Sequence, residues 1–181
     1  MEIRINLAIV GLLGTFWALL AASSPEGVVD GGVPVGLEDH VAHHPGDREA
    51  LLELSDRYLD AGHPAVVLAL IHAGEGSLSG HPLVAHRLSR AYEGLGRFGD
   101  AARTARLAER QCARAFGLGD APTGTAVPDF DCTAGEYAML ETHARAVDLM
   151  LDWGMVSAGD PRRARAYSVA LRRARVASFT P

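Results

Sequence analysis

The stretch LSDRYLDAG at residues 54–62 recurs 34 residues later as LSRAYEGLG at residues 88–96. Four positions keep their residue type across that interval: Leu54 and Leu88, Ser55 and Ser89, Tyr58 and Tyr92, and Gly62 and Gly96. In each copy the leucine and the tyrosine share one face of a helix, and the glycine follows where that helix must stop. The interval predicts a helical hairpin that occurs twice within residues 48–109.

Start and stop signals divide each copy into two helices. Asp47 is placed to cap the first helix, and Pro64 and Pro82 stand where a first helical turn begins. The apolar periodicity then predicts four helices, at residues 48–61, 65–73, 82–94 and 98–116. Because 48% of the residues are hydrophobic and only 6% are aromatic, the core must be built mostly from Ala, Leu and Val, which favours helices over strands. The predicted fold class is all-α.

The repeated residues resemble the tetratricopeptide repeat family, in which a helical hairpin recurs with a period of about 34 residues. The leucine, the small serine and the tyrosine of both copies match that family's pattern, and Ala101 matches its alanine. Leu51 and Ala85 stand in place of the family's tryptophan. The resemblance implies a short right-handed solenoid of helical hairpins, with two repeats over residues 47–116.

By that resemblance, the first helix of each repeat lines a concave groove that binds a peptide or a partner protein. The residues expected to face the groove lie on the two helices that carry the tyrosines: Asp56, Leu59, Asp60, His86, Arg90 and Glu93. The implied groove is of mixed charge. Plain solvation of an exposed helix face is the alternative for each of these residues.

A third helical pair is expected near the C-terminus, because two repeats bury a core poorly. It follows residues 117–132, a loop rich in Gly and Pro, and spans residues 133–178. Thr133 and Glu136 have the spacing of a capping box, and Asp160 precedes the final helix. The inward residues are expected to be Tyr137, Leu140, Ala144, Val147 and Leu151 on one helix and Ala164, Tyr167, Leu171 and Ala174 on the other.

The final helix carries a cluster of arginines, here called the basic face: Arg162, Arg163, Arg165, Arg172, Arg173 and Arg175. Two interpretations stay open. A terminal repeat needs a polar outer face, which favours simple solvation of these side chains. The other interpretation is electrostatic binding to anionic lipid headgroups or to an acidic partner.

The N-terminal segment contains an apolar run over residues 5–22. As a helix this run would extend roughly 27 Å, just short of a hydrocarbon core of roughly 30 Å. Arg4 precedes the run and the next basic residue is Arg48, so the positive-inside rule places the remainder of the chain outside the cytoplasm. Residues 1–22 are therefore expected to be a transmembrane anchor or a signal sequence. The expected location is a bacterial inner membrane with the helical domain in the periplasm, or export after signal cleavage.

The two cysteines fit that location, because paired cysteines in an exported chain commonly form a disulfide. Cys112 and Cys132 lack the close spacing of a redox or zinc motif. A bond between them would close a loop of about 21 residues and stabilise the fold by roughly 3 kcal/mol. Two separate buried thiols are the alternative.

Residues 23–46 are rich in Gly, Pro and acidic residues and are predicted to form a flexible linker. The linker contains His40, His43 and His44. On a helical turn His40 and His44 would share a face, as two ligands of a metal clip, but no further ligand stands at a fixed spacing from them. A solvated histidine-rich linker is the preferred interpretation, and a periplasmic metal-handling module is the alternative. No metal or cofactor is assigned.

Charge and motif content argue against two further classes of function, nucleic-acid binding and catalysis. The net charge of −5 argues against general nucleic-acid binding, which needs a basic excess. No nucleophile-elbow, zinc-protease, Walker or Rossmann pattern is present, and His143 falls between two apolar faces, as a hydrogen-bonded helix residue commonly does. An enzyme is not expected. We expect a membrane-anchored or exported scaffold or assembly factor that binds a protein or peptide partner.

Overall fold

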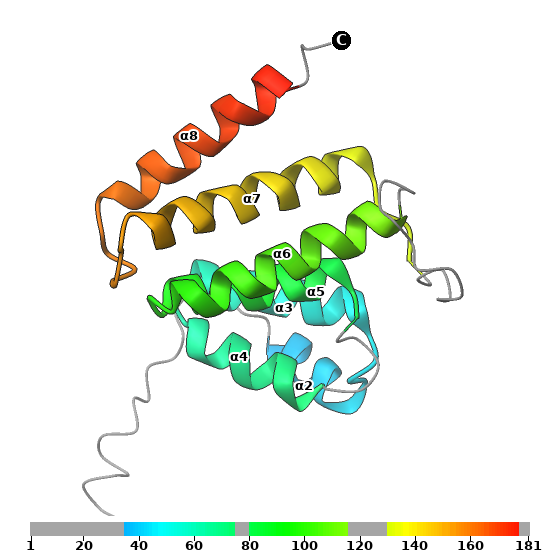
Figure 1. Ribbon diagram of the computed structural model, residues 1–181. Helices are drawn as coiled ribbons and strands as arrows, with labels where there is room; N and C mark the ends of the chain where they lie inside the picture. The colour runs from blue at the N-terminus through cyan, green and yellow to red at the C-terminus, as the bar shows by residue number, and fades with distance from the viewer. Residues whose placement is uncertain (1–34, 75–79, 116–129, 178–181) are drawn as a thin grey trace, which may run out of the picture. The chain divides into compact units, whose positions relative to one another are not determined.

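The computed structural model describes residues 35–74, 80–115 and 130–177, with side chains between 36 and 172. Within these ranges it contains helices and no strand, which confirms the all-α fold class (Figure 1). The helices are α2 (Val35–His43), α3 (Arg48–Asp60), α4 (Pro64–Ala73), α5 (Pro82–Gly94), α6 (Phe98–Ala115), α7 (Ala134–Asp152) and α8 (Arg162–Ala177).

The 34-residue period is present in the helix boundaries. Helices α3 and α5 both have 13 residues, and their first residues, Arg48 and Pro82, are one period apart. Helices α4 and α6 begin at Pro64 and Phe98, again one period apart. The predicted bounds of these four helices are confirmed to within a residue or two.

The repeated glycines end α3 and α5 by the same hydrogen-bonding scheme. Gly62 has φ +78° and Gly96 has φ +72°, values that a residue with a Cβ atom adopts only under strain. The amide of His63 donates to Tyr58 O at 2.8 Å, and that of Arg97 donates to Tyr92 O at 2.9 Å. These are the bonds of a Schellman motif, which satisfies carbonyls at a helix end. Gly154, with φ +63°, follows the end of α7 in the same way.

Polar side chains cap the helix starts. Asp47 accepts a hydrogen bond from the amide of Ala50 at 3.1 Å, as predicted for the N-cap of α3. Thr133 and Glu136 form the predicted capping box at the start of α7. The sequence therefore fixes most helix ends locally.

Each helix packs against the next one along the chain, and α6 lies between α5 and α7. Small side chains make this close packing possible, because Ala101, Ala105 and Ala108 of α6 are at most 1% exposed. A separate core cluster joins α3 and α4 to α5, with Leu54 1% and Val67 0% exposed.

The predicted linker needs a correction. Residues 23–46 include helix α2, whose Val41 is buried in the core cluster of α3 and α4. The sequence did not predict this helix because its apolar residues are few and their periodicity is weak. Its burial results from its packing against α3. The expected anchor at residues 1–22 lies outside the described residues. Among the described helices, none has the length and apolar character needed to cross a bilayer.

The inward stripe of the last helix also needs a correction. On the part of α8 whose side chains are described, the buried residues are Ala166 and Ala170, both 0% exposed, whereas Ala164 is exposed and Leu171 is 49% exposed. The side chain of Ala174 lies outside the described residues. The described part of the helix therefore faces α7 through small alanines. On α7 the expected Leu140, Ala144 and Val147 are buried, but Met150 takes the buried position at the end of the stripe and Leu151 is 44% exposed.

We predict different costs for alanine at the two repeated glycines. Both substitutions place a Cβ atom at positive φ, which costs about 1–2 kcal/mol. At Gly62 nothing lies within 4 Å of that atom, whereas at Gly96 it would meet Val156 O at 3.0 Å. Gly96→Ala should therefore lower the free energy of unfolding more than Gly62→Ala, as measured by urea denaturation.

The matched control is Gly99→Ala on α6, where the added Cβ has open space. This substitution should be neutral or stabilising, by about 0.5–1 kcal/mol, because alanine is the better helix former. Equal costs at Gly62 and Gly96 would contradict the role given to Val156.

Candidate functional site

A hollow of about 680 Å³ lies among α5, α7 and α8, and is here called the α5/α7/α8 hollow. Its lining combines arginine and histidine with apolar side chains: His86, Arg90, Ala138, Met139, Thr142, His143, Arg163, Tyr167 and Leu171. Met139 and Leu171 are 39% and 49% exposed. The helices that form the hollow are held together by a buried hydrogen-bond network.

Glu93 of α5 is the centre of that network. Its side chain is fully buried, and it accepts a hydrogen bond from Arg163 Nε at 2.5 Å and another from the Tyr167 hydroxyl at 2.8 Å. A buried carboxylate without such partners would cost several kcal/mol. Since both donors come from α8, the position of this helix on α5 depends on Glu93. Burial, reinforced by the Glu93 carboxylate, raises the pKa of the Tyr167 hydroxyl above its usual value, so it remains a donor.

His143 of α7 extends the network. Its Nδ1 lies 2.8 Å from the Tyr167 hydroxyl and its Nε2 lies 2.9 Å from Ser89 Oγ. Burial lowers the pKa of His143 to about 4, against the opposing effect of Glu93, so the ring is neutral at pH 7. Tyr167 donates its proton to Glu93 and Ser89 donates its proton to Ala101 O, so both hydroxyl oxygens face the ring as acceptors, and the neutral ring donates to only one of them.

Ser89 of α5 completes the network, with Oγ 2.8 Å from Ala101 O and 2.9 Å from His143 Nε2. The order serine, histidine, tyrosine, glutamate has the connectivity of a nucleophile, a base and an orienting group. Ser89 is fully buried, however, and does not line the hollow. A substrate in the hollow would not contact its Oγ, and we assign the network to holding α5, α7 and α8 together.

His86 is fixed by its neighbour on the same helix. Arg87 donates to both oxygens of Asp56, at 3.0 and 2.6 Å, and its NH1 lies 3.3 Å from His86 Nδ1. A guanidinium only donates, so His86 Nδ1 must be an acceptor and Nε2 must carry the proton. Burial, then the neighbouring His143 and arginines, lower the pKa of His86 to about 2. His86 is thus a neutral N–H donor on the hollow.

Arg90 has a weaker partner than the other arginines of this region. Its NH1 reaches Asp56 Oδ1 only at 4.0 Å, and both oxygens of Asp56 already accept from Arg87. The Arg90 side chain is 37% exposed and lines the hollow. Its guanidinium therefore keeps donors available for a ligand.

The six residues predicted to face a groove lie in different surroundings in the structure. His86 and Arg90 line the hollow, and Asp56 lies beside it through its pairs with Arg87 and Arg90. Glu93 was expected to meet a partner, but it is sealed in the interior by Arg163 and Tyr167, which the local pattern of α5 could not indicate. Leu59 packs partly against the core of α3 and α4, and Asp60 is exposed away from the hollow.

The basic face is divided by its contacts. Arg163 was assigned to the basic face, but it turns inward to Glu93. Arg162 binds Asp160 at 2.6 Å and also donates to Trp153 O. Arg165 and Arg172 are exposed, and Arg173 and Arg175 have side chains outside the described set. Of the four arginines whose side chains are described, Arg162 and Arg163 are thus engaged within the fold.

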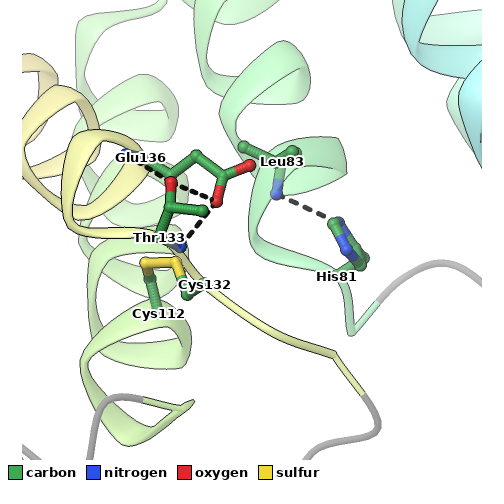
Figure 2. The surroundings of a disulfide bond; sticks show 6 residues. All are labelled: His81, Leu83, Cys112, Cys132, Thr133 and Glu136. Atoms are coloured by element: carbon green, nitrogen blue, oxygen red, sulfur yellow. Dashed lines mark hydrogen bonds between the residues drawn. A yellow bond between two sulfur atoms is a disulfide. The ribbon is translucent and has the colours of Figure 1, made fainter.

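The predicted disulfide between Cys112 and Cys132 is present, with the two Cα atoms 5.5 Å apart. It joins the last turns of α6 to the residue before the capping box of α7 (Figure 2). In the same region His81 Nδ1 accepts from the amide of Leu83 at 3.2 Å, at the start of α5. The bond therefore fixes the beginning of α7 against α6.

The histidines of the predicted linker lie on and after α2. His40 and His44 stack with ring centroids 4.6 Å apart, which confirms that they share a face, and His40 Nε2 lies 2.8 Å from Asp47 Oδ2. His43 instead contacts its own helix through Asp39. In the described part of the chain, no three residues of metal-binding type gather closely enough to hold an ion.

The chain was compared with protein-family models, with curated proteins and with solved structures, and none of them matches.

The functional residues that sequence reasoning missed come from α7 and α8. His143 was expected to be a hydrogen-bonded helix residue, and it is, but its partners Ser89 and Tyr167 are 54 and 24 residues away. Arg163 was assigned to the basic face, and the apolar stripe of α8 proved to be rotated from the predicted one. Its separation of 70 residues from Glu93 leaves no local signal.

We predict that Tyr167→Phe lowers the free energy of unfolding by about 1–3 kcal/mol. The change removes one hydroxyl and leaves two buried groups, Glu93 Oε2 and His143 Nδ1, each short of a partner. Tyr92→Phe is the matched control, because the Tyr92 hydroxyl makes no hydrogen bond to a described residue and the ring remains beneath Arg97. Chemical denaturation of both variants measures the difference, and equal losses would contradict the network.

We also predict a loss of stability as the pH falls below about 6.5. In the folded chain His86 and His143 have lowered pKa values, about 2 and about 4, so near pH 5 the unfolded chain binds protons that the folded chain does not. The free energy of unfolding therefore keeps the full contribution of the two histidines above pH 6.5. Towards pH 4 it falls by about 1.4 kcal/mol per pH unit for each histidine.

Urea midpoints measured between pH 7.5 and 4.5 test this dependence. In His86→Phe the slope below pH 6.5 should decrease by roughly one proton's contribution. His63→Gln, a change at an exposed histidine, is the control. A flat profile for the unmodified chain would show that neither buried ring is held neutral.

Proposed function

We propose that this chain is a scaffold or assembly factor that binds a partner protein or peptide in the α5/α7/α8 hollow. The observation that carries the proposal is the composition of the hollow, where the exposed apolar side chains of Met139 and Leu171 lie beside Arg90 and Arg163. Recognition surfaces commonly combine an apolar anchor site with directional polar groups. The site stands on three helices that are tied together by buried hydrogen bonds, so little ordering is needed on binding.

The 34-residue period of the helix boundaries supports a solenoid of tetratricopeptide type, with α3–α4 and α5–α6 as its two repeats and α7–α8 as a divergent third pair. In this proposal the hollow is part of the concave groove. The hollow also receives residues from α8, the second helix of its pair.

We further propose that the domain works outside the reducing cytoplasm, either anchored in a bacterial inner membrane or exported. The Cys112–Cys132 bond supports this location, because such bonds persist in oxidising compartments. The apolar run at residues 5–22 supports a membrane anchor or a signal sequence.

Site-specific photo-crosslinking tests the binding function. A photoreactive amino acid at Met139, inside the hollow, should give a discrete crosslinked product in native membranes. The same amino acid at Arg103, which is 76% exposed on α6 and outside the hollow, should not. Filling the hollow with Thr142→Trp should abolish the Met139 product while circular dichroism remains unchanged. Equal products from both positions, or none from Met139, would contradict the proposal.

A further inference from the structure

The polar groups that face the α5/α7/α8 hollow are mainly hydrogen-bond donors. Among the described residues, its charged lining residues are Arg90 and Arg163 and no carboxylate lines it, because Glu93 is buried behind Arg163 and Tyr167. The chain as a whole carries a net charge of −5. The hollow is thus a cationic site on an acidic protein, which selects for a ligand group of negative charge.

Three donors remain for such a group. Arg163 uses Nε for Glu93, and its two terminal nitrogens make no hydrogen bond within the described residues. Arg90 has only the 4.0 Å contact with Asp56. His86 carries its proton on Nε2, since Nδ1 faces the Arg87 guanidinium, and its position on α5 places it one turn from Arg90.

The remaining wall is apolar. Met139 of α7 and Leu171 of α8 are among the exposed large hydrophobic residues of the described chain, and Ala138 lies beside them. An ion alone would leave this wall in water, whereas a segment that carries an apolar side chain next to an acid would cover it. Another hollow, about 560 Å³ among α2, α3 and α4, has an acid, Glu38, in its lining and no arginine among the described residues that line it. It lacks the charge needed for the same ligand.

We propose that the α5/α7/α8 hollow binds an internal Asp or Glu side chain of a partner segment, with the carboxylate on Arg90, Arg163 and His86 and a neighbouring apolar side chain on Met139 and Leu171. The inference rests on the proposed function and specifies the chemistry of the partner. The arginine donors form charge-assisted hydrogen bonds, which are about twice as strong as neutral ones. The apolar contact supplies the non-directional part of the binding energy.

The test uses a pooled library of octapeptides, randomised at every position, N-acetylated and C-terminally amidated so that side chains are the only source of a carboxylate. The immobilised full-length chain is incubated with the pool, and bound peptides are sequenced by mass spectrometry. Peptides with an acid next to Leu, Ile, Met or Phe should be enriched. In the Arg90→Gln variant their retention should fall about tenfold or more.

Arg165→Gln is the matched control, because it removes the same charge from an exposed position on α8 that does not line the hollow. Its retention of acidic peptides should equal that of the unmodified chain. An equal loss in both variants would overturn the inference in favour of general charge attraction. A parallel pool with free C-termini tests whether the hollow binds the C-terminal carboxylate of a peptide instead. If only peptides of that pool are retained, the assignment to a side chain is overturned.

The remaining outcomes separate this inference from the function on which it rests. If the enriched peptides are neutral or basic and the Thr142→Trp variant loses them, the hollow binds peptides but the acidic assignment fails. If no peptide is retained while Met139 still crosslinks to a protein partner, the acidic peptide is again rejected and the binding function survives. If both experiments are negative, both proposals fail.

Discussion

The buried carboxylate of Glu93 is the constraint on which the arrangement of α5, α7 and α8 depends. A charge at this depth is tolerated only with donors on its oxygens, and Arg163 and Tyr167 supply them from a helix 70 residues away. Such a pair adds little net stability compared with an apolar packing of the same volume, but a shift of α8 that separated it from Glu93 would leave the buried carboxylate without its donors. The network thus fixes where the hollow lies and which side chains line it.

The same contacts set the charge of the hollow. Glu93 accepts hydrogen bonds from one nitrogen of Arg163 and from the Tyr167 hydroxyl, and Asp56 accepts from Arg87. The polar groups left to face the hollow are hydrogen-bond donors, and they lie beside the exposed side chains of Met139 and Leu171. Ser89, which contacts His143, is completely buried and is not part of this surface.

Equivalent residues in the two repeats have different surroundings, and this limits what a repeat pattern predicts. Ser55 and Ser89 are both fully buried, yet Ser89 Oγ contacts Ala101 O and His143, while Ser55 Oγ has no hydrogen-bond partner among the described residues. The Tyr58 hydroxyl donates to Glu38 of α2, whereas Tyr92 packs against α6 and α7. The repeat determines the position of each residue on its helix, and the neighbouring helices determine its role.

The sequence by itself determined the helices from α3 onwards and most of their ends, because caps, first-turn prolines and positive-φ glycines act within a few residues of chain. It also indicated the disulfide, since only two cysteines were available to pair. Only the tertiary structure decided that α2 joins the core, that α8 faces inward through Ala166 and Ala170, and that Glu93 is buried rather than offered to a partner. Each of those depends on a contact with a different helix, and the energy of a buried polar group is set by partners that are far away in the chain.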